Sequence, residues 1–111
     1  MQRSEGSKGV MTILLNENTR VCMQGITGST GQFQAEEMLR ARTKLVAGVS
    51  PGRGGKNVAG IPVFDTVASA VRDTGAEMTV MFIAAARCKD AIFEAIDANI
   101  RTIICVAEFM P

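Results

Sequence analysis

Apolar and polar positions follow two different patterns along the chain after its first residues. Short runs are apolar at nearly every position and end at glycine, proline or polar residues, which is typical of strands buried on both faces. Five such runs predict strands at residues 20–24, 45–50, 61–64, 78–83 and 102–106.

Three segments between these runs have the spacing of helices. Residues 32–42 place acidic side chains early and basic side chains late, as the helix dipole favours. Asp65 or Thr66 can cap a short helix that runs through Val71 and is ended by Gly75. Residues 89–98 form the third predicted helix, which stops at Asn99 because asparagine tolerates the left-handed conformation.

Strands that are apolar on both faces and separated by helices indicate a parallel sheet covered on both sides. We therefore predict an α/β, Rossmann-like domain with a mostly parallel five-stranded sheet and helices on both faces. It spans residues 12–111 and follows a flexible polar leader at residues 1–11. No closing helix follows the last predicted strand, which favours a fragment of a longer protein; a minimal stand-alone domain is the alternative.

Composition excludes several classes of chemistry, because the 111 residues include no histidine and only three cysteines. A Ser-His-Asp triad, a Cys-His pair, a phosphohistidine and a histidine-ligated metal cannot form. Three cysteines cannot supply a four-thiolate metal site either. We therefore expect neither a catalytic residue nor a metal site within this chain.

The formal net charge is +1, and the first ten residues account for it, so the remainder is neutral. This balance favours neither a nucleic-acid partner nor a polybasic membrane contact. No apolar run approaches the roughly 20 residues of a membrane span, and the polar start does not look like a signal peptide. The odd number of cysteines fits a reducing cytoplasm.

The loop after the first predicted strand, residues 25–31, is rich in glycine and in hydroxyl side chains. Open α/β sheets bind ligands at the carboxyl ends of their strands, and a glycine-rich helix start offers N–H groups to an anion. The spacing G-x-x-G-x-x-G is not the dinucleotide motif, and no Walker A lysine follows. A phosphate or pyrophosphate is the expected ligand; a turn that only packs a helix onto a strand is the alternative.

The loop after the second predicted strand distinguishes between nucleotides. An NAD site has an acidic residue at this place, which holds the ribose hydroxyls. This chain has Arg53 and Lys56 instead, and cations there suit a phosphate on the ribose, as in NADP or coenzyme A (CoA). A solvated basic turn is the alternative. Three roles stay open for Glu108, which follows the last predicted strand: contact with a ligand, capping of a following helix, or exposure to solvent.

The three cysteines have different surroundings in the sequence. Cys22 and Cys105 lie within apolar runs and are predicted to be core residues. Cys88 precedes a predicted helix between Arg87 and Lys89, so it fits either a reactive thiolate or simple packing at the helix start.

Four motifs occur together in this chain: TGSTG, SPGRGG, GIPVFDTV and CKDAIFEAIDA. With them, residues 12–111 resemble the N-terminal CoA-binding domain of the succinyl-CoA synthetase (succinate-CoA ligase) α subunit, in the acyl-CoA synthetase superfamily. The resemblance implies CoA as cofactor and three stretches of CoA-binding residues: Thr27, Gly28, Ser29, Thr30, Arg53, Val106, Ala107 and Glu108. Arg53 stands at a position where the family usually has lysine, and the resemblance implies that Arg53 contacts a CoA phosphate.

The family implies a nucleotide-dependent ligase that activates an acid as an acyl phosphate and captures the acyl group on CoA. Its phosphohistidine lies in a following domain and exchanges phosphate with the nucleotide site of a β subunit. This chain alone is therefore expected to hold CoA but to be inactive, in the cytoplasm or, in a eukaryote, the mitochondrial matrix. Two alternatives stay open: a stand-alone CoA-binding or regulatory module, and an NADP-binding Rossmann domain of an oxidoreductase.

Several positions depart from the family pattern. The family has a proline-containing segment where this chain has AAAR at residues 84–87. A glycine is common at the position of Phe109, and bacterial enzymes often have histidine at that of Gln34. Residues 84–87 and Phe109 are expected on the CoA rim, so these departures bear on its shape and affinity and leave the acid undefined.

Overall fold

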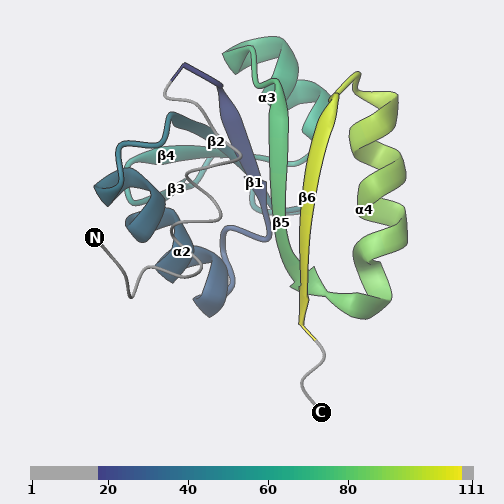
Figure 1. The fold of residues 1–111 in the computed structure, drawn as a ribbon, viewed down its shortest axis with the longest axis horizontal. Coiled ribbons are helices and arrows are strands. Elements are labelled where there is room, and N and C mark those ends of the chain that lie inside the picture. Colours follow the sequence, from purple (N-terminus) through teal and green to yellow (C-terminus); the bar gives the residue numbers. More distant parts are fainter. Residues whose placement is uncertain (1–17, 109–111) are drawn as a thin grey trace, which may run out of the picture.

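The computed structural model describes residues 18–108. Within this range the strands form a six-stranded sheet in the order β3-β4-β2-β1-β5-β6 (Figure 1). Neighbouring strands are parallel, except that β3 and β4 are antiparallel. The elements in chain order are β1 (Val21–Gln24), α2 (Ser29–Arg40), β2 (Leu45–Val49), β3 (Asn57–Val58), β4 (Ile61–Phe64), α3 (Val67–Thr74), β5 (Met78–Ala84), α4 (Ala85–Asp97) and β6 (Thr102–Glu108).

The predicted α/β, Rossmann-like arrangement is confirmed, but the described part of the sheet has six strands rather than five. The additional strand β3 has two residues, and it pairs Asn57 with Pro62 and Val58 with Ile61. Two residues are too few to show a strand pattern, so β3 could not be predicted. The predicted leader at residues 1–11 lies outside the described residues, and the extent of the domain stays a prediction.

Two helices begin earlier than their periodicity predicts. α2 starts at Ser29 instead of residue 32, and α4 starts at Ala85 instead of residue 89. The first turn of α2 is Ser-Thr-Gly-Gln and that of α4 is Ala-Ala-Arg-Cys, so neither turn has a large apolar residue that would mark it in the sequence. α3 follows its predicted cap, because the Thr66 hydroxyl accepts a hydrogen bond from the Ser69 N–H, and it ends at Gly75.

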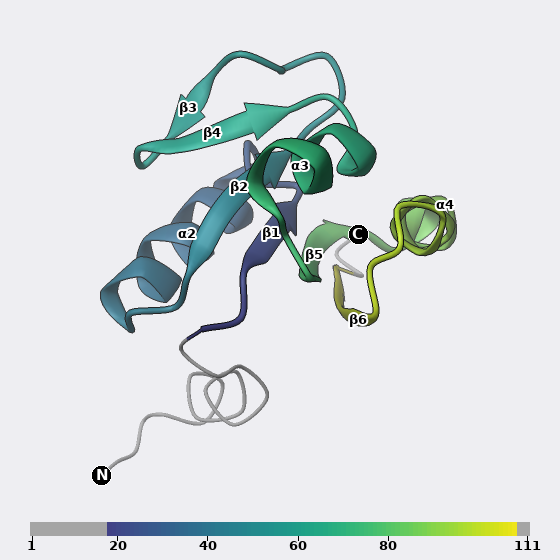
Figure 2. The same cartoon turned by 90° about the horizontal axis from the view of Figure 1, so that it is seen from above.

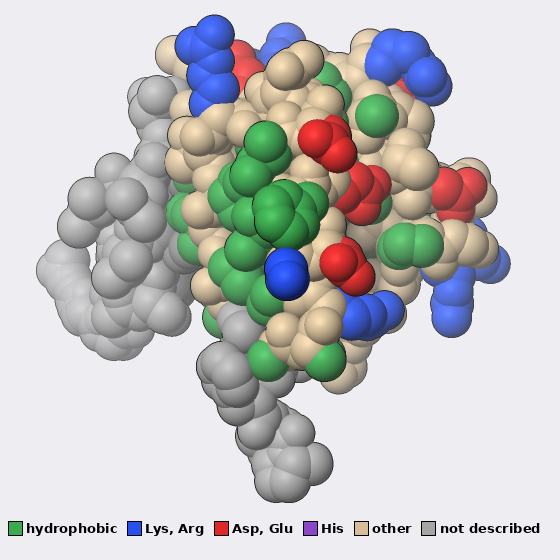
Figure 3. All heavy atoms as spheres, turned by 90° about the vertical axis from the view of Figure 1, so that its right-hand side faces the viewer, with side chains coloured by type: hydrophobic (Ala, Val, Ile, Leu, Met, Phe, Trp, Pro, Cys, Tyr) green, Lys and Arg blue, Asp and Glu red, His purple; other side chains and the backbone are tan. Residues whose placement is uncertain are grey.

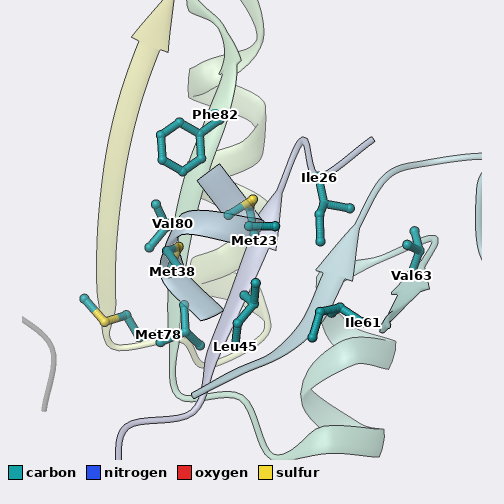
Figure 4. Close-up of a cluster of buried hydrophobic side chains, with 11 residues drawn as sticks. Met23, Ile26, Met38, Leu45, Ile61, Val63, Met78, Val80 and Phe82 are labelled. Atoms are coloured by element: carbon teal, nitrogen blue, oxygen red, sulfur yellow. The ribbon is translucent and has the colours of Figure 1, made fainter. Parts of the chain in front are cut away.

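α2 covers one face of the sheet, and α3 and α4 cover the other (Figure 2). Successive strand residues point to opposite faces, so Val21 and Met23 pack on the α2 side whereas Cys22 packs on the side of α3 and α4. Figure 4 shows the first of these two clusters, with Met38 of α2 among side chains of β1, β2 and β5. Two fully packed faces hold the carboxyl ends of the central strands in fixed positions.

β6 is the edge strand of the sheet and pairs with β5 alone among the described strands. Cys22, in β1 at the centre of the sheet, is fully buried, as predicted. Cys105, in β6, is exposed, so its prediction as a core residue is wrong. No helix within residues 18–108 combines the length and apolar character needed to cross a membrane.

Candidate functional site

A cavity of about 410 Å³ lies at the carboxyl ends of β1, β2 and β5, beside α4. β1 stands between β2 and β5, so the chain leaves β1 toward one side of the sheet and later returns on the other. This switch point is where open α/β sheets bind ligands. The cavity is lined by Gln24, Gly25, Thr27, Val49, Ser50, Pro51, Arg53, Ile83, Arg87, Asp90, Ala91 and Glu94.

The loop from β1 to α2 is held by close backbone contacts. Gly25 has a φ of 86°, a backbone conformation that residues with a side chain rarely adopt. A Cβ added at Gly31 would lie 2.0 Å from the Gly25 carbonyl oxygen. Glycine at both positions therefore lets α2 start directly against the end of β1.

Thr27 joins this loop to its neighbours. Its Oγ1 lies 2.6 Å from Oγ of Ser50, at the end of β2. Its carbonyl oxygen accepts a hydrogen bond from Nε2 of Gln32 at 2.8 Å. The two contacts fix Thr27, which lines the cavity as one of the predicted CoA-binding residues.

The other three predicted residues of the first loop lie beside the cavity lining. Gly28 is the N-cap of α2, and Ser29 and Thr30 are its first helical residues. No side chain caps this helix start, so its first backbone N–H groups have no side-chain acceptor. The first loop thus ends in a set of donors next to the cavity.

Asp65 shapes the loop that carries Arg53. Its Oδ1 accepts hydrogen bonds from Gly52 N at 2.8 Å and from Gly54 N at 2.9 Å, on either side of Arg53. A Cβ at Gly54 would lie 2.6 Å from Asp65 Oδ2, so this packing requires glycine. Arg53 is thereby placed at the cavity, whereas Lys56 lines a neighbouring hollow beside β3 and β4.

α4 forms a wall of the cavity, of which only Arg87 was anticipated from the sequence, within residues 84–87 at the expected CoA rim. Arg87, Asp90 and Glu94 succeed one another at helical spacing and line the cavity. Glu94 Oε2 also accepts a hydrogen bond at 2.8 Å from the N–H of Val67, the first residue of α3. Asp90 and Glu94 were not singled out in the sequence, and helical spacing continued forward from Arg87 is the signal that would have found them.

Gln24 is a further lining residue that the sequence did not reveal. Thr79 Oγ1 donates a hydrogen bond to Gln24 Oε1 at 3.0 Å. Both side chains are buried, so this pairing satisfies two polar groups that water cannot reach. It also fixes the orientation of the Gln24 amide at the end of β1.

Val106, Ala107 and Glu108 lie at the carboxyl end of β6, one strand beyond the cavity. They pair with residues 82–84 of β5, so they lie at the same carboxyl end of the sheet as the cavity. Val106 is not among the residues that line the cavity. The backbone of the third predicted stretch thus lies one strand away from β5, whose Ile83 lines the cavity, and Phe109 lies outside the described residues.

The cavity lining carries both signs of charge. Arg53 and Arg87 form no ion pair with any described residue, and Asp90 is likewise unpaired there. Glu94 differs because it already accepts the hydrogen bond from α3. Within residues 18–108, no group of three or more Cys, Asp or Glu side chains could hold a metal ion. The groups available to a ligand are thus two guanidinium groups, one carboxylate and the donors of the first loop.

Two solved structures share the fold at low sequence identity. A Rex-family repressor matches with a TM-score of 0.69 and 17% identity, covering 96% of this chain and 56% of the repressor chain. Dihydrodipicolinate reductase from Paenisporosarcina sp. TG-14 matches with a TM-score of 0.62 and 17% identity, covering 83% of this chain and 38% of the reductase. At this identity the matches show the Rossmann-like fold alone.

Curated proteins with much higher identity are α subunits of succinate–CoA ligase (ADP-forming). Subunit alpha 1 of Archaeoglobus fulgidus is 52% identical over 101 residues, which cover 91% of this chain and 35% of the subunit. The Aquifex aeolicus and Staphylococcus aureus (strain Mu50) subunits are 48% and 46% identical over the same share of this chain and 33% of their own length. The chain thus spans about a third of the length of these relatives.

The family model described as the CoA binding domain matches residues 16–109, which include both glycine-rich loops and the cavity between them. That match covers most of the chain, and the relatives named above agree with it. The chain therefore belongs to the CoA-binding domain family and is homologous to the α subunits of succinate–CoA ligase.

Proposed function

We propose that this chain holds CoA within a nucleotide-dependent acid–CoA ligase, with the CoA phosphates between the start of α2, the Arg53 loop and α4. The observation that carries the proposal is that Arg53 and Arg87 line one cavity at the switch point of the sheet and are paired with no described residue. The match of residues 16–109 to the CoA-binding family supports the choice of CoA.

The charges of the site favour a phosphate-bearing ligand. A guanidinium group can donate two parallel hydrogen bonds to a phosphate. The loop after β2 has no acidic residue between positions 50 and 56, so the usual partner of unmodified ribose hydroxyls is missing there. We assign Arg53 to the phosphate on the CoA ribose and Arg87 to a second phosphate oxygen.

The start of α2 suits the remaining phosphates. Its uncapped N–H groups and the positive end of the helix dipole favour an anion, and Ser29 and Thr30 add hydroxyl donors. Asp90 can accept hydrogen bonds from the adenine amino group or a ribose hydroxyl. We place Val106, Ala107 and Glu108 along the part of CoA that extends past the cavity, because they lie at the same carboxyl end of the sheet.

The role in a ligase is inferred from the relatives. In such a reaction the CoA thiol attacks the carbonyl carbon of an acyl phosphate, a thioester bond forms, and the C–O bond to phosphate breaks. This chain has no histidine, so a phosphohistidine belongs to another part of the protein, and a β subunit supplies the nucleotide site. The residues of this chain bind and orient CoA, in the cytoplasm or, in a eukaryote, the mitochondrial matrix.

Calorimetric titration with CoA, dephospho-CoA and NADP tests the ligand. We expect CoA to bind most tightly and dephospho-CoA at least about 10-fold more weakly, because a hydrogen bond to a charged group contributes about 1.5–3 kcal/mol. Arg53→Glu should remove that difference. The matched control is Arg101→Glu. Arg101 is exposed and lies just before β6, at the amino end of the strands, so this change should leave both affinities unchanged. Equal binding of CoA and dephospho-CoA, or tighter binding of NADP, would contradict the proposal.

The ligase role has a separate test, since CoA binding alone also fits a stand-alone module. Reading the gene beyond residue 111 decides between them. A downstream domain with a histidine available for phosphorylation supports the ligase. A stop codon at this position contradicts it and favours a CoA-binding module without catalysis, whatever the titrations show.

A further inference from the structure

Two thiols from different elements meet beside the start of α4. Cys88 lies in the first turns of α4 and Cys105 in β6, and their Sγ atoms are 3.1 Å apart. The Cys105 thiol donates a hydrogen bond to the Cys88 sulfur. Both are free cysteines, separated by 17 residues in the sequence.

Both thiols can be reached by small molecules. Cys105 is exposed and Cys88 is partly exposed, whereas Cys22 is fully buried in the core. The pair lies at the side of the molecule formed by β6 and α4, the right-hand side of Figure 1. Figure 3 views that side and shows hydrophobic side chains gathered there next to acidic ones. Exposed apolar residues of these two elements include Phe93, Ile96 and Val106.

We propose that Cys88 and Cys105 form an oxidation site, at which hydrogen peroxide or a low-molecular-weight disulfide converts the two thiols into a reversible intramolecular disulfide. The sulfur atoms of a disulfide are about 2.0 Å apart, so the pair has to close by about 1 Å. In a reducing compartment such bonds are transient and redox-sensing rather than structural.

Cys88 is assigned the first step. Cys88 lies in the first turn of α4, where Arg87 and Lys89 are its sequence neighbours. Cys105 suits the second step. Burial beside its neighbours and its hydrogen bond to Cys88 raise the pKa of the Cys105 thiol to about 11, so it keeps its proton while Cys88 reacts.

With peroxide, the Cys88 thiolate attacks one oxygen, the O–O bond breaks, and a sulfenic acid and hydroxide form. The Cys105 sulfur then attacks the Cys88 sulfur, the S–O bond breaks, and water leaves. In total two thiols lose two electrons and two protons, and the peroxide becomes two water molecules. With a disulfide such as oxidised glutathione, Cys88 forms a mixed disulfide and Cys105 displaces the second thiol, so two glutathione molecules are released.

The bond would fasten the helical turn that carries Arg87 to the edge strand of the sheet. Arg87 lines the cavity proposed for CoA, so the oxidation site adjoins the ligand site. The oxidation site itself stands on the contact between the two sulfur atoms and does not depend on CoA binding.

The test is peptide mapping of the full 111-residue chain after treatment with hydrogen peroxide or oxidised glutathione and alkylation of the remaining thiols. We expect a mass loss of about 2 Da, a cross-linked peptide joining Cys88 to Cys105, and recovery of both thiols with dithiothreitol. Cys22 is the internal control, and it should be alkylated only after unfolding. Cys88→Ser and Cys105→Ser should each abolish the mass loss, with Cys105→Ser accumulating a sulfenic acid or a glutathione adduct at Cys88.

Three outcomes would overturn the proposal. In one, both thiols are still alkylated fully after the oxidant. In another, the cross-link joins two chains through Cys105. In the third, Cys105 rather than Cys88 carries the adduct in the unaltered chain and no internal cross-link follows.

Discussion

The hydroxyl oxygens of Thr27 and Ser50 lie 2.6 Å apart and join the loop after β1 to the end of β2. Both residues line the cavity at the switch point of the sheet. Either hydroxyl can donate this hydrogen bond. The hydroxyl that accepts it keeps its own proton for a ligand, and the oxygen of the donor can still accept a hydrogen bond from one. The position of each loop is thus tied to that of the other.

Removing the Thr27 hydroxyl at similar volume, with Thr27→Val, is expected to weaken CoA binding about 3–10-fold, because a hydrogen bond contributes a net 0.5–1.5 kcal/mol or so. Ser50→Ala should have an effect of the same size. The double variant should lose little more than either single variant, since both changes remove one shared interaction. Calorimetry on all four proteins measures this coupling, and fully additive losses would show that the hydroxyls act separately.

Gly31 and Gly28 provide a matched pair for the packing of α2 against β1. A Cβ at Gly31 would lie 2.0 Å from the Gly25 carbonyl oxygen, whereas a Cβ at Gly28 meets that oxygen at 3.6 Å, an ordinary contact. Gly31→Ala is therefore expected to lower the free energy of unfolding by about 1–3 kcal/mol. Gly28→Ala, at a φ of −73° that alanine adopts freely, should cost less than about 1 kcal/mol. Urea unfolding compares the two, and equal losses would refute the packing argument.

The strands could be predicted well because they are buried on both faces. In β1, Val21 and Met23 face α2 while Cys22 faces the opposite layer, so every position is apolar and the run is easy to recognise. The same pattern misled in β6. An apolar run cannot show whether a strand has one neighbour or two, so Cys105 was expected in the core although it lies on the sheet edge.

The candidate site was only partly predictable. Thr27 and Arg53 follow strands in loops with glycine, and such loops stand out in a sequence. Gln24 gave no such signal, and Arg87 was anticipated only as one of residues 84–87 at the expected CoA rim. Arg87 reaches the cavity because α4 begins before its apolar pattern does, and Gln24 is held at the end of β1 by Thr79, more than 50 residues away. Contacts of this kind depend on the fold and leave no local pattern.

Comparing variants of Arg87 and Lys89 distinguishes a direct contact with the ligand from a general effect of positive charge. Both are exposed cations in the first turns of α4, but only Arg87 lines the cavity. Arg87→Ala is expected to weaken CoA binding about 10–100-fold, the range for a hydrogen bond to a charged group. Lys89→Ala should change the affinity less than about 2-fold at physiological ionic strength, because an exposed charge away from the ligand is screened. Similar losses in the two variants would contradict a direct contact of Arg87 with CoA.

The Cys105 thiol predicts a dependence of stability on pH. Partial burial and the hydrogen bond to Cys88 raise its pKa from the ordinary value of 9.0 to about 11 in the folded chain. Between these values the unfolded chain has lost this proton while the folded chain keeps it, so stability that is fully present below about pH 9 is lost as the pH rises toward about 11. Cys105→Ser removes this contribution, and Cys22, whose pKa is also raised by burial, is common to both proteins. In urea unfolding with a reducing agent, the free energy of unfolding of the unaltered chain should therefore fall more steeply over this range than that of Cys105→Ser. Parallel pH profiles would show that the thiol ionises alike in both states.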